Sequence, residues 1–172
     1  MAAGDVKSAY AASASLVVTN LHSLPASQTW IAGWESAMID NTANLYLDYL
    51  ISGLFKTAAA NNQVGEVRVY IVAMIADAVW PDVFDGTESV ETISLVNVRD
   101  AIAKMGAVLS VTAGASLSYP FGPFSVAALF GGVCPAKFVV FVAGNATTVA
   151  TAQFAADTNI VTIKGVYNTV EP

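Results

Sequence analysis

Charged residues are scarce in this chain, and so are histidine and cysteine, the side chains that most often carry chemistry. Only 12% of the 172 residues are charged, against about 25% in a typical globular protein. There is one histidine, His22, and one cysteine, Cys134, so an intramolecular disulfide is excluded. Seven lysines and arginines against thirteen acidic residues give a net charge of −6. That balance disfavours binding to nucleic acid or to an anionic membrane.

The shortage of histidine and cysteine limits the catalytic sites that the chain can build. A Ser-His-Asp triad or a histidine-based metal site would have to use His22, which has no acidic neighbour in the sequence. A Cys134–His22 nucleophilic pair meets the same difficulty, and Cys134 is expected to be a buried thiol. Phosphate-binding, dinucleotide-binding and zinc-binding motifs are absent. We therefore predict a protein that is not an enzyme and has no catalytic residue, cofactor or metal, and a small hydrolase is the weakest alternative.

One segment is rich in carboxylates. Residues 77–91 contain five of them: Asp77, Asp82, Asp85, Glu88 and Glu91. Ca²⁺ takes six to eight oxygen ligands, but the spacing here does not match the EF-hand pattern. We interpret the segment as a solvated acidic loop, and its capacity for divalent ions stays open.

Hydrophobic residues are abundant, yet they occur in short runs. They make up 55% of the chain, and no charge occurs between Lys104 and Lys137. That stretch is interrupted by glycine and proline at positions 120, 122, 123, 131, 132 and 135. A membrane-spanning helix needs about 20 apolar residues without such breakers. The pattern favours β-strands separated by turns, and a chain with little charge favours a large interface with other subunits.

Several segments have the periodicity of strands. Residues 45–54 and 66–75 alternate between apolar and polar positions, and we predict that they pair antiparallel through a loop. Residues 138–142 are continuously apolar, so both faces of this strand should be covered. Residues 160–170 form the predicted closing strand, with a bulge at Gly165.

The remaining segments are predicted with less regular structure. Residues 15–19 and 107–112 are short strand candidates, whereas residues 30–35 look irregular. A turn of helix is expected near residues 99–104. Turns are expected at residues 120–123 and 144–145, where glycine, proline and asparagine cluster.

These elements together predict an all-β fold. The best architecture is a β-sandwich, jelly-roll-like, in one domain of residues 15–172, and an immunoglobulin-like sandwich is the near alternative. Residues 1–14 are rich in alanine and serine and are predicted to be a flexible N-terminal arm. The start of the chain does not read as a secretory signal, so synthesis in a cytoplasm is expected.

Three tryptophans are candidate binding residues. Trp30, Trp34 and Trp80 fall in predicted loops, where they would be exposed. Exposed aromatic rings could stack on sugars, which makes a module that binds glycans on a host surface an alternative function.

Two groups of short motifs resemble a known family. The first group is Asp40-Asn41-Thr42 with Asn44-Leu45-Tyr46-Leu47-Asp48, then Val69-Tyr70 and Trp80-Pro81-Asp82-Val83-Phe84-Asp85-Gly86-Thr87. The second is Phe121-Gly122-Pro123, Ala128-Leu129-Phe130-Gly131-Gly132, Pro135-Ala136-Lys137, Phe141-Val142 and Gly165-Val166-Tyr167-Asn168-Thr169-Val170. Their order along residues 36–170 resembles the decoration or cement proteins of tailed bacteriophages.

The resemblance implies a structural protein of the virion. It would bind the outer surface of an icosahedral head, contact the major capsid protein and stabilise contacts between capsid subunits. A homo-oligomer is expected, and capsid symmetry suggests a trimer. The resemblance does not identify the contact residues; from the predicted arm and loops we expect Met1, Ala2, Val6 and Tyr10, together with Trp30, Trp34 and Trp80. A component of the tail or of the base of a head fibre is the structural alternative.

Overall fold

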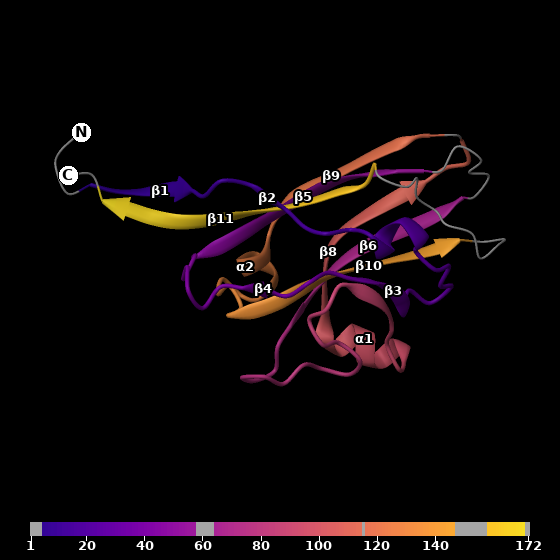
Figure 1. Ribbon diagram of the computed structural model, residues 1–172, viewed down its shortest axis with the longest axis horizontal. Coiled ribbons are helices and arrows are strands. Elements are labelled where there is room, and N and C mark those ends of the chain that lie inside the picture. Colours follow the sequence, from indigo (N-terminus) through magenta and orange to yellow (C-terminus); the bar gives the residue numbers. More distant parts are fainter. Residues whose placement is uncertain (1–4, 58–63, 115, 147–157, 171–172) are drawn as a thin grey trace.

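Two antiparallel β-sheets pack face to face in the computed structural model of the chain (Figure 1). The structure describes residues 5–57, 64–114, 116–146 and 158–170. The predicted all-β sandwich is confirmed, whereas the jelly-roll connectivity stays a prediction. Among the described residues no helix has the length and hydropathy needed to cross a membrane.

The first sheet has the strand order β1-β11-β5-β9, and β2 pairs with β11 outside this path. Its strands are β1 (Val6–Tyr10), β2 (Ala14–Ser15), β5 (Asp48–Lys56), β9 (Ser118–Ser125) and β11 (Ile160–Val170). The predicted closing strand is therefore confirmed as β11. Its register with β5 runs without interruption from Ile160 to Val166, so the bulge predicted at Gly165 is wrong. Gly165 instead lies beneath the ring of Tyr46, where a Cβ atom would be 2.3 Å from Tyr46 Cδ2.

The second sheet has the order β7-β3-β10-β6-β8, and β4 pairs with β10. Its strands are β3 (Ala32–Glu35), β4 (Ile39–Asp40), β6 (Gly65–Ala73), β7 (Ser89–Thr92), β8 (Ala103–Val111) and β10 (Lys137–Ala146). The described part of the chain also contains three short helices: η1 (Asn20–Ser23), α1 (Val96–Ile102) and α2 (Val126–Leu129). Figure 1 shows α1 on the side of this sheet that faces away from the first sheet.

Strand β10 is buried on both faces, as its continuous apolar run predicts. Phe138, Val140 and Val142 belong to the main core between the sheets. The intervening side chains, which include Val139 and Phe141, belong to a second core that packs against Trp30, Trp80 and residues of α1. A central strand between two cores must be apolar at every position, which explains why this segment lacks alternation.

The predicted pairing of residues 45–54 with residues 66–75 is wrong. Strand β5 pairs with β11 and β9, whereas β6 pairs with β10 and β8 in the other sheet. The burial pattern explains the difference. Strand β6 is buried on both faces near its end, where Tyr70 and Val72 contribute to the second core, so it occupies an interior position beside β10.

Other local predictions also differ from the structure. Residues 120–123 lie inside β9 and residues 144–145 lie inside β10, so neither segment is a turn. Proline is tolerated in β9 because β9 is an edge strand, where an unpaired backbone position costs little. Residues 32–35 form β3 rather than irregular chain, and the strand predicted at 15–19 is reduced to β2. The N-terminal arm differs too, since residues 6–10 form β1, paired in register with β11.

Candidate interaction surface

A two-stranded ribbon projects from the sandwich. It consists of β1 and residues 166–170 of β11, which pair from Val6↔Val170 to Tyr10↔Val166. Figure 1 shows this ribbon extending beyond the other strands of the sheet. Apolar side chains are exposed at both ends of the ribbon: 66% of Val6 and 60% of Val170 at its outer end, and 57% of Tyr10 at its base. Because no other described strand packs over the ribbon, these apolar side chains face water, which is typical of a segment that contacts a partner.

The ribbon has two distinct faces. Along β11, Val161 is buried in the core and Gly165 is buried beneath the Tyr46 ring, and Tyr167, two residues farther on, shares their face. The Tyr167 ring lies 5.9 Å from the ring of Tyr46. The opposite face carries Tyr10. The Lys164 ammonium group lies over its ring, 5.3 Å from the centroid, in a cation–π contact. Both contacts fix the base of the ribbon on the body.

An open cleft of about 560 Å³ lies at the base of the ribbon. It is lined by Ala11, Tyr167 and Asn168 of the ribbon region and by residues 44–47 of the loop before β5. Leu45 in this loop is 74% exposed and has a positive φ of 50°. A branched side chain in a left-handed backbone conformation is uncommon, and here it places an aliphatic group at the mouth of a cleft.

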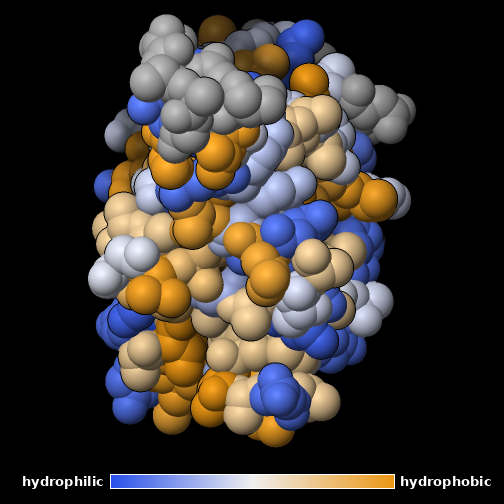
Figure 2. Space-filling model, turned by 90° about the vertical axis from the view of Figure 1, so that its left-hand side faces the viewer, coloured by the Kyte–Doolittle hydropathy of each residue, from blue (hydrophilic) through white to orange (hydrophobic). Residues whose placement is uncertain are grey.

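Further exposed aliphatic side chains lie at the same end of the sandwich. The loops before β5, after β6 and before β10 meet there, because Phe138 at the start of β10 pairs with Ala73 and contacts the ring of Tyr49. We call the exposed side chains of these loops the end face: Leu45, Leu47, Ile75, Val79 and Val133. Figure 2 views the molecule from this side and shows hydrophobic side chains distributed between hydrophilic ones.

The acidic loop is anchored to the body through a buried glutamate. Glu35 is fully buried, and its Oε1 accepts a hydrogen bond of 2.7 Å from the backbone N–H of Gly86. Its Oε2 has no partner among the described residues. The pKa of Glu35 is raised from 4.5 to about 7, mainly by burial; the charges of Asp85 and Glu91 contribute to the rise, and the hydrogen bond from Gly86 opposes it. Position 86 requires glycine because its φ is +81°, a backbone conformation that other residues rarely adopt.

A second glutamate of the loop is also structural. Glu88 Oε1 accepts hydrogen bonds from the backbone N–H of Asn20 at 2.8 Å and from Trp34 Nε1 at 2.7 Å. Its Oε2 accepts a bond of 2.7 Å from Asn20 Nδ2. Asp82 likewise accepts a bond of 2.7 Å from the backbone N–H of Ser94. Several of the carboxylates are thus already hydrogen-bonded, and no group of three potential metal ligands occurs among the described residues.

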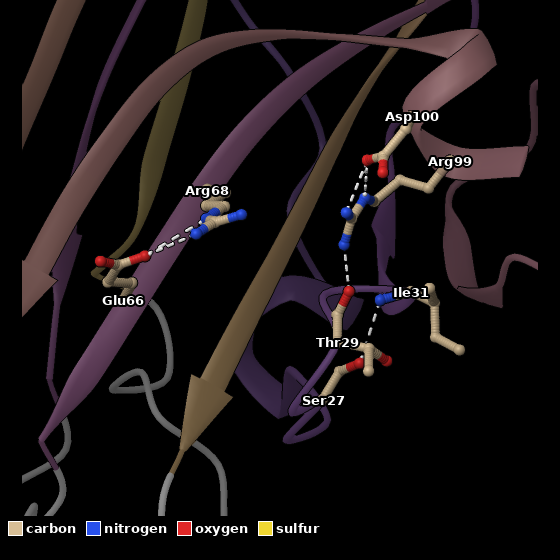
Figure 3. A network of polar contacts seen from close by, with 7 residues as sticks. All are labelled: Ser27, Thr29, Ile31, Glu66, Arg68, Arg99 and Asp100. Carbon is tan, nitrogen blue, oxygen red and sulfur yellow. Dashed lines mark hydrogen bonds and ion pairs between the residues drawn. The ribbon is translucent and has the colours of Figure 1, made fainter. Parts of the chain in front are cut away.

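Polar contacts fix α1 and the chain before β3 on the outer face of the second sheet (Figure 3). The buried Arg99 donates to the carbonyl oxygen of Thr29 and forms an ion pair of 2.6 Å with Asp100. Ser27 Oγ accepts hydrogen bonds from the backbone N–H groups of Ile31 and Ala32. These contacts hold a turn and a helix in place, and we interpret them as structural.

The same face positions one of the predicted binding residues. The guanidinium group of Arg68 lies 3.6 Å from the centroid of a Trp30 ring, and it also forms an ion pair of 2.9 Å with Glu66. This arrangement covers one face of the indole. Trp30 is therefore half-buried beneath a cation rather than open for stacking on a sugar.

Trp34 and Trp80 also differ from the expected loop tryptophans. Trp34 lies in β3 and is fully buried in the main core, so its prediction as an exposed contact residue is wrong. The cause is the alternation of β3, which turns this side chain inward. Trp80 is half-buried and packs against the second core. Val6 and Tyr10 lie exposed on the ribbon, whereas Met1 and Ala2 lie outside the described residues.

His22 and Cys134 occupy opposite ends of β5. His22 Nδ1 lies 2.8 Å from Asn159 Nδ2, and Asn159 Oδ1 accepts a bond from the N–H of Lys56 at the end of β5. Cys134 is half-buried near Asp48 and Tyr49 at the start of that strand, and burial raises the pKa of its thiol to about 11. The two ends of β5 are about 25 Å apart at the usual rise per residue, so His22 and Cys134 form no nucleophile–base pair.

Sequence reasoning missed the anchoring roles of Glu35 and Glu88. Nothing in the local pattern distinguishes these glutamates from solvated ones, since the groups that they bind are 51 and 54 residues away in the chain. It also missed Tyr167 and the leucines beside it. The local pattern misleads for the leucines, because alternation places Leu45 and Leu47 on the same face as the buried Tyr49 and Ile51, whereas β5 begins only at Asp48.

Comparisons of the chain with known protein families, with curated proteins and with solved structures found no match.

Proposed function

We propose that this chain is a structural protein of a phage virion that decorates the capsid. It binds the outer surface of the icosahedral head, contacts the major capsid protein and stabilises contacts between capsid subunits. The observation that carries the proposal is the projecting ribbon beside the end face, which presents apolar side chains and main-chain groups at one end of a β-sandwich. The resemblance of residues 36–170 to decoration proteins agrees with this function.

The proposed mechanism is thermodynamic. A protein that binds only the assembled shell stabilises that shell by mass action. The ribbon and the end face supply apolar contact area, and the low charge of the chain reduces the desolvation cost of burying it. Many symmetry-related copies would then resist the internal pressure of packaged DNA together.

The copy number of the chain in purified particles tests the proposal directly. Quantitative mass spectrometry of virions of the phage that encodes it should give a copy number comparable with that of the major capsid protein. A few copies per particle would instead place the chain in the tail or at the base of a head fibre. Absence from the particle would refute a virion role.

The binding surface is tested with particles that lack the protein. Leu47→Asp places a charge on the end face and should reduce occupancy when purified protein is added back. The matched control is Leu95→Asp, because Leu95 is similarly exposed, at 59% against 54%, but precedes α1. Equal loss of binding in both variants, or in neither, would contradict a contact through the end face.

A second variant tests the ribbon. Deletion of residues 1–11 removes β1 and leaves β2 and the core strands in the chain. Occupancy should fall while the circular dichroism spectrum and the thermal midpoint of the body are retained. Unchanged occupancy would remove the ribbon from the proposed interface.

A further inference from the structure

Strand β1 presents an open edge whose hydrogen-bonding groups can be assigned from its pairing. The backbone N–H of Ala11 donates to the carbonyl oxygen of Gly165 at 2.9 Å. Hydrogen-bonded and non-hydrogen-bonded pairs alternate along an antiparallel ladder. Lys7 and Ala9 therefore direct their backbone groups toward β11. Val6, Ser8 and Tyr10 direct theirs outward, and among the described residues no strand pairs with that edge.

The other sheet edges are better protected. Edge strand β9 contains Pro120 and Pro123, and proline lacks the N–H that a new strand would need. Edge strand β7 has only four residues. Strand β8 packs beside β9, where a Cβ atom on Gly106 would be 2.4 Å from the Phe124 ring. The edge of β1 has none of these features and stands clear of the body in Figure 1.

We propose that two copies of this chain associate through antiparallel pairing of β1 with β1 of the second copy, with Ser8 opposite Ser8 on a two-fold axis. In this register Val6 faces Tyr10 of the second copy, and the reverse. The residues of β1 whose backbone groups point outward then lie opposite the equivalent residues of the second copy. Three such pairs give about six main-chain hydrogen bonds between the copies. The pairing joins the two first sheets into one continuous sheet.

The side chains of β1 agree with this register. Val6 and Tyr10 are 66% and 57% exposed in the single chain, and aliphatic–aromatic pairs across strands are stabilising. Lys7 lies opposite Ala9 of the second copy, so its charge does not directly face its own equivalent. Each chain carries a net charge of −6, and a contact at the ribbon keeps the two acidic bodies apart.

This inference goes beyond the proposed function, because it concerns the backbone edge of β1 and is tested without capsids. The two share the ribbon, so deletion of residues 1–11 tests capsid binding and does not test the dimer. Its test is the mass of the purified chain in solution, measured over a range of concentrations by analytical ultracentrifugation. The wild type should form a dimer. Ser8→Pro should form a monomer, because it removes the outward N–H at the centre of the contact and leaves the bonds to β11 intact. The matched control Ser8→Ala retains the N–H and should remain dimeric.

Amide exchange measured by nuclear magnetic resonance gives a second, residue-specific readout. Pairing between copies should slow exchange at Val6, Ser8 and Tyr10 in the wild type, at concentrations where the dimer is populated. In Ser8→Pro the amides of Val6 and Tyr10 should exchange rapidly, whereas Lys7 and Ala9 keep their protection. A wild type that stays monomeric would overturn the proposal. So would a dimer or trimer that persists in Ser8→Pro with rapid exchange at Val6 and Tyr10.

Discussion

At the scale of single residues, the carboxylates of the acidic loop region show how tertiary contacts change the role of a side chain. Glu35 and Glu88 are ordinary polar residues in the sequence, but both end as hydrogen-bond acceptors within or beside the core. Their neighbours Asp77 and Asp85 are exposed. The difference arises because the fold places backbone and indole N–H groups within hydrogen-bonding distance of Glu35 and Glu88. Each of these two glutamates leads to a testable prediction.

Glu35 should make the stability of the protein fall as pH rises. Its pKa is about 7 in the folded protein and 4.5 when unperturbed, so the folded state binds the extra proton. The favourable contribution is complete below pH 4.5 and is lost as pH rises through about 7. The expected loss is at most about 3 kcal/mol.

Urea denaturation over this pH range measures the effect. Glu35→Gln keeps an oxygen for the Gly86 N–H but has no charge to bury, so its free energy of unfolding should exceed that of the wild type increasingly at higher pH. Parallel pH profiles for the two proteins would show that Glu35 titrates normally.

Glu88→Ala should destabilise the fold by about 2–3 kcal/mol. The substitution removes the acceptor for Asn20 and leaves the indole N–H of buried Trp34 without its partner. Asp77→Ala is the control, because Asp77 is an exposed carboxylate of the same loop. Thermal unfolding followed by tryptophan fluorescence measures both. A Glu88 variant as stable as the Asp77 variant would contradict the anchoring role.

At the scale of elements, β11 joins the body to the ribbon, and Gly165 marks the transition. The Tyr46 ring covers Gly165, and beyond this point β11 pairs with β1 alone, apart from its last pair with β5 at Val166. Aromatic residues Tyr46, Tyr49 and Tyr167 surround the junction. The Tyr46 ring therefore packs at the point where the ribbon leaves the sheet.

Gly165→Ala should destabilise the protein by about 1–3 kcal/mol, because the new methyl group overlaps the Tyr46 ring. In a Tyr46→Ala background the same substitution should cost much less. A double-mutant cycle by chemical denaturation measures this coupling. Additive effects of the two substitutions would mean that the ring moves aside without cost.

The sequence predicted a strand correctly where the apolar pattern of that segment alone is enough to identify it. Strand β11 and the two-sided burial of β10 follow from local apolar patterns. Strand β9 was missed because its prolines and Gly122 resemble a turn, and only its edge position makes them compatible with a strand. The N-terminal strand β1 was missed because its alanine and serine give little apolar signal without β11 beside it.

At the scale of the whole molecule, stability should be distributed unevenly between the body and the ribbon. Strands β10 and β6 lie between two cores, whereas the ribbon carries exposed apolar side chains and no other described strand packs over it. Regions with few buried contacts open at low free energy. The ribbon should therefore open far more readily than the centre of the second sheet.

Native-state hydrogen exchange tests this order. Amides of β10 and β6 should exchange only through global unfolding, and amides of β1 that bond to β11 should exchange through local opening with a much smaller free energy. At a concentration that disfavours association, equal protection in β1 and β10 would show that the ribbon is an integral part of the core.

The sequence by itself determined the class of fold. Short apolar runs separated by glycine and proline favour strands, scarce charge favours extensive burial, and a single histidine and cysteine limit the chemistry. Only the tertiary structure decided which strands are neighbours, which tryptophans are buried and which glutamates are anchors. The physical reason is that alternation specifies the two faces of a strand, whereas pairing partners and buried hydrogen bonds depend on contacts between residues far apart in the chain.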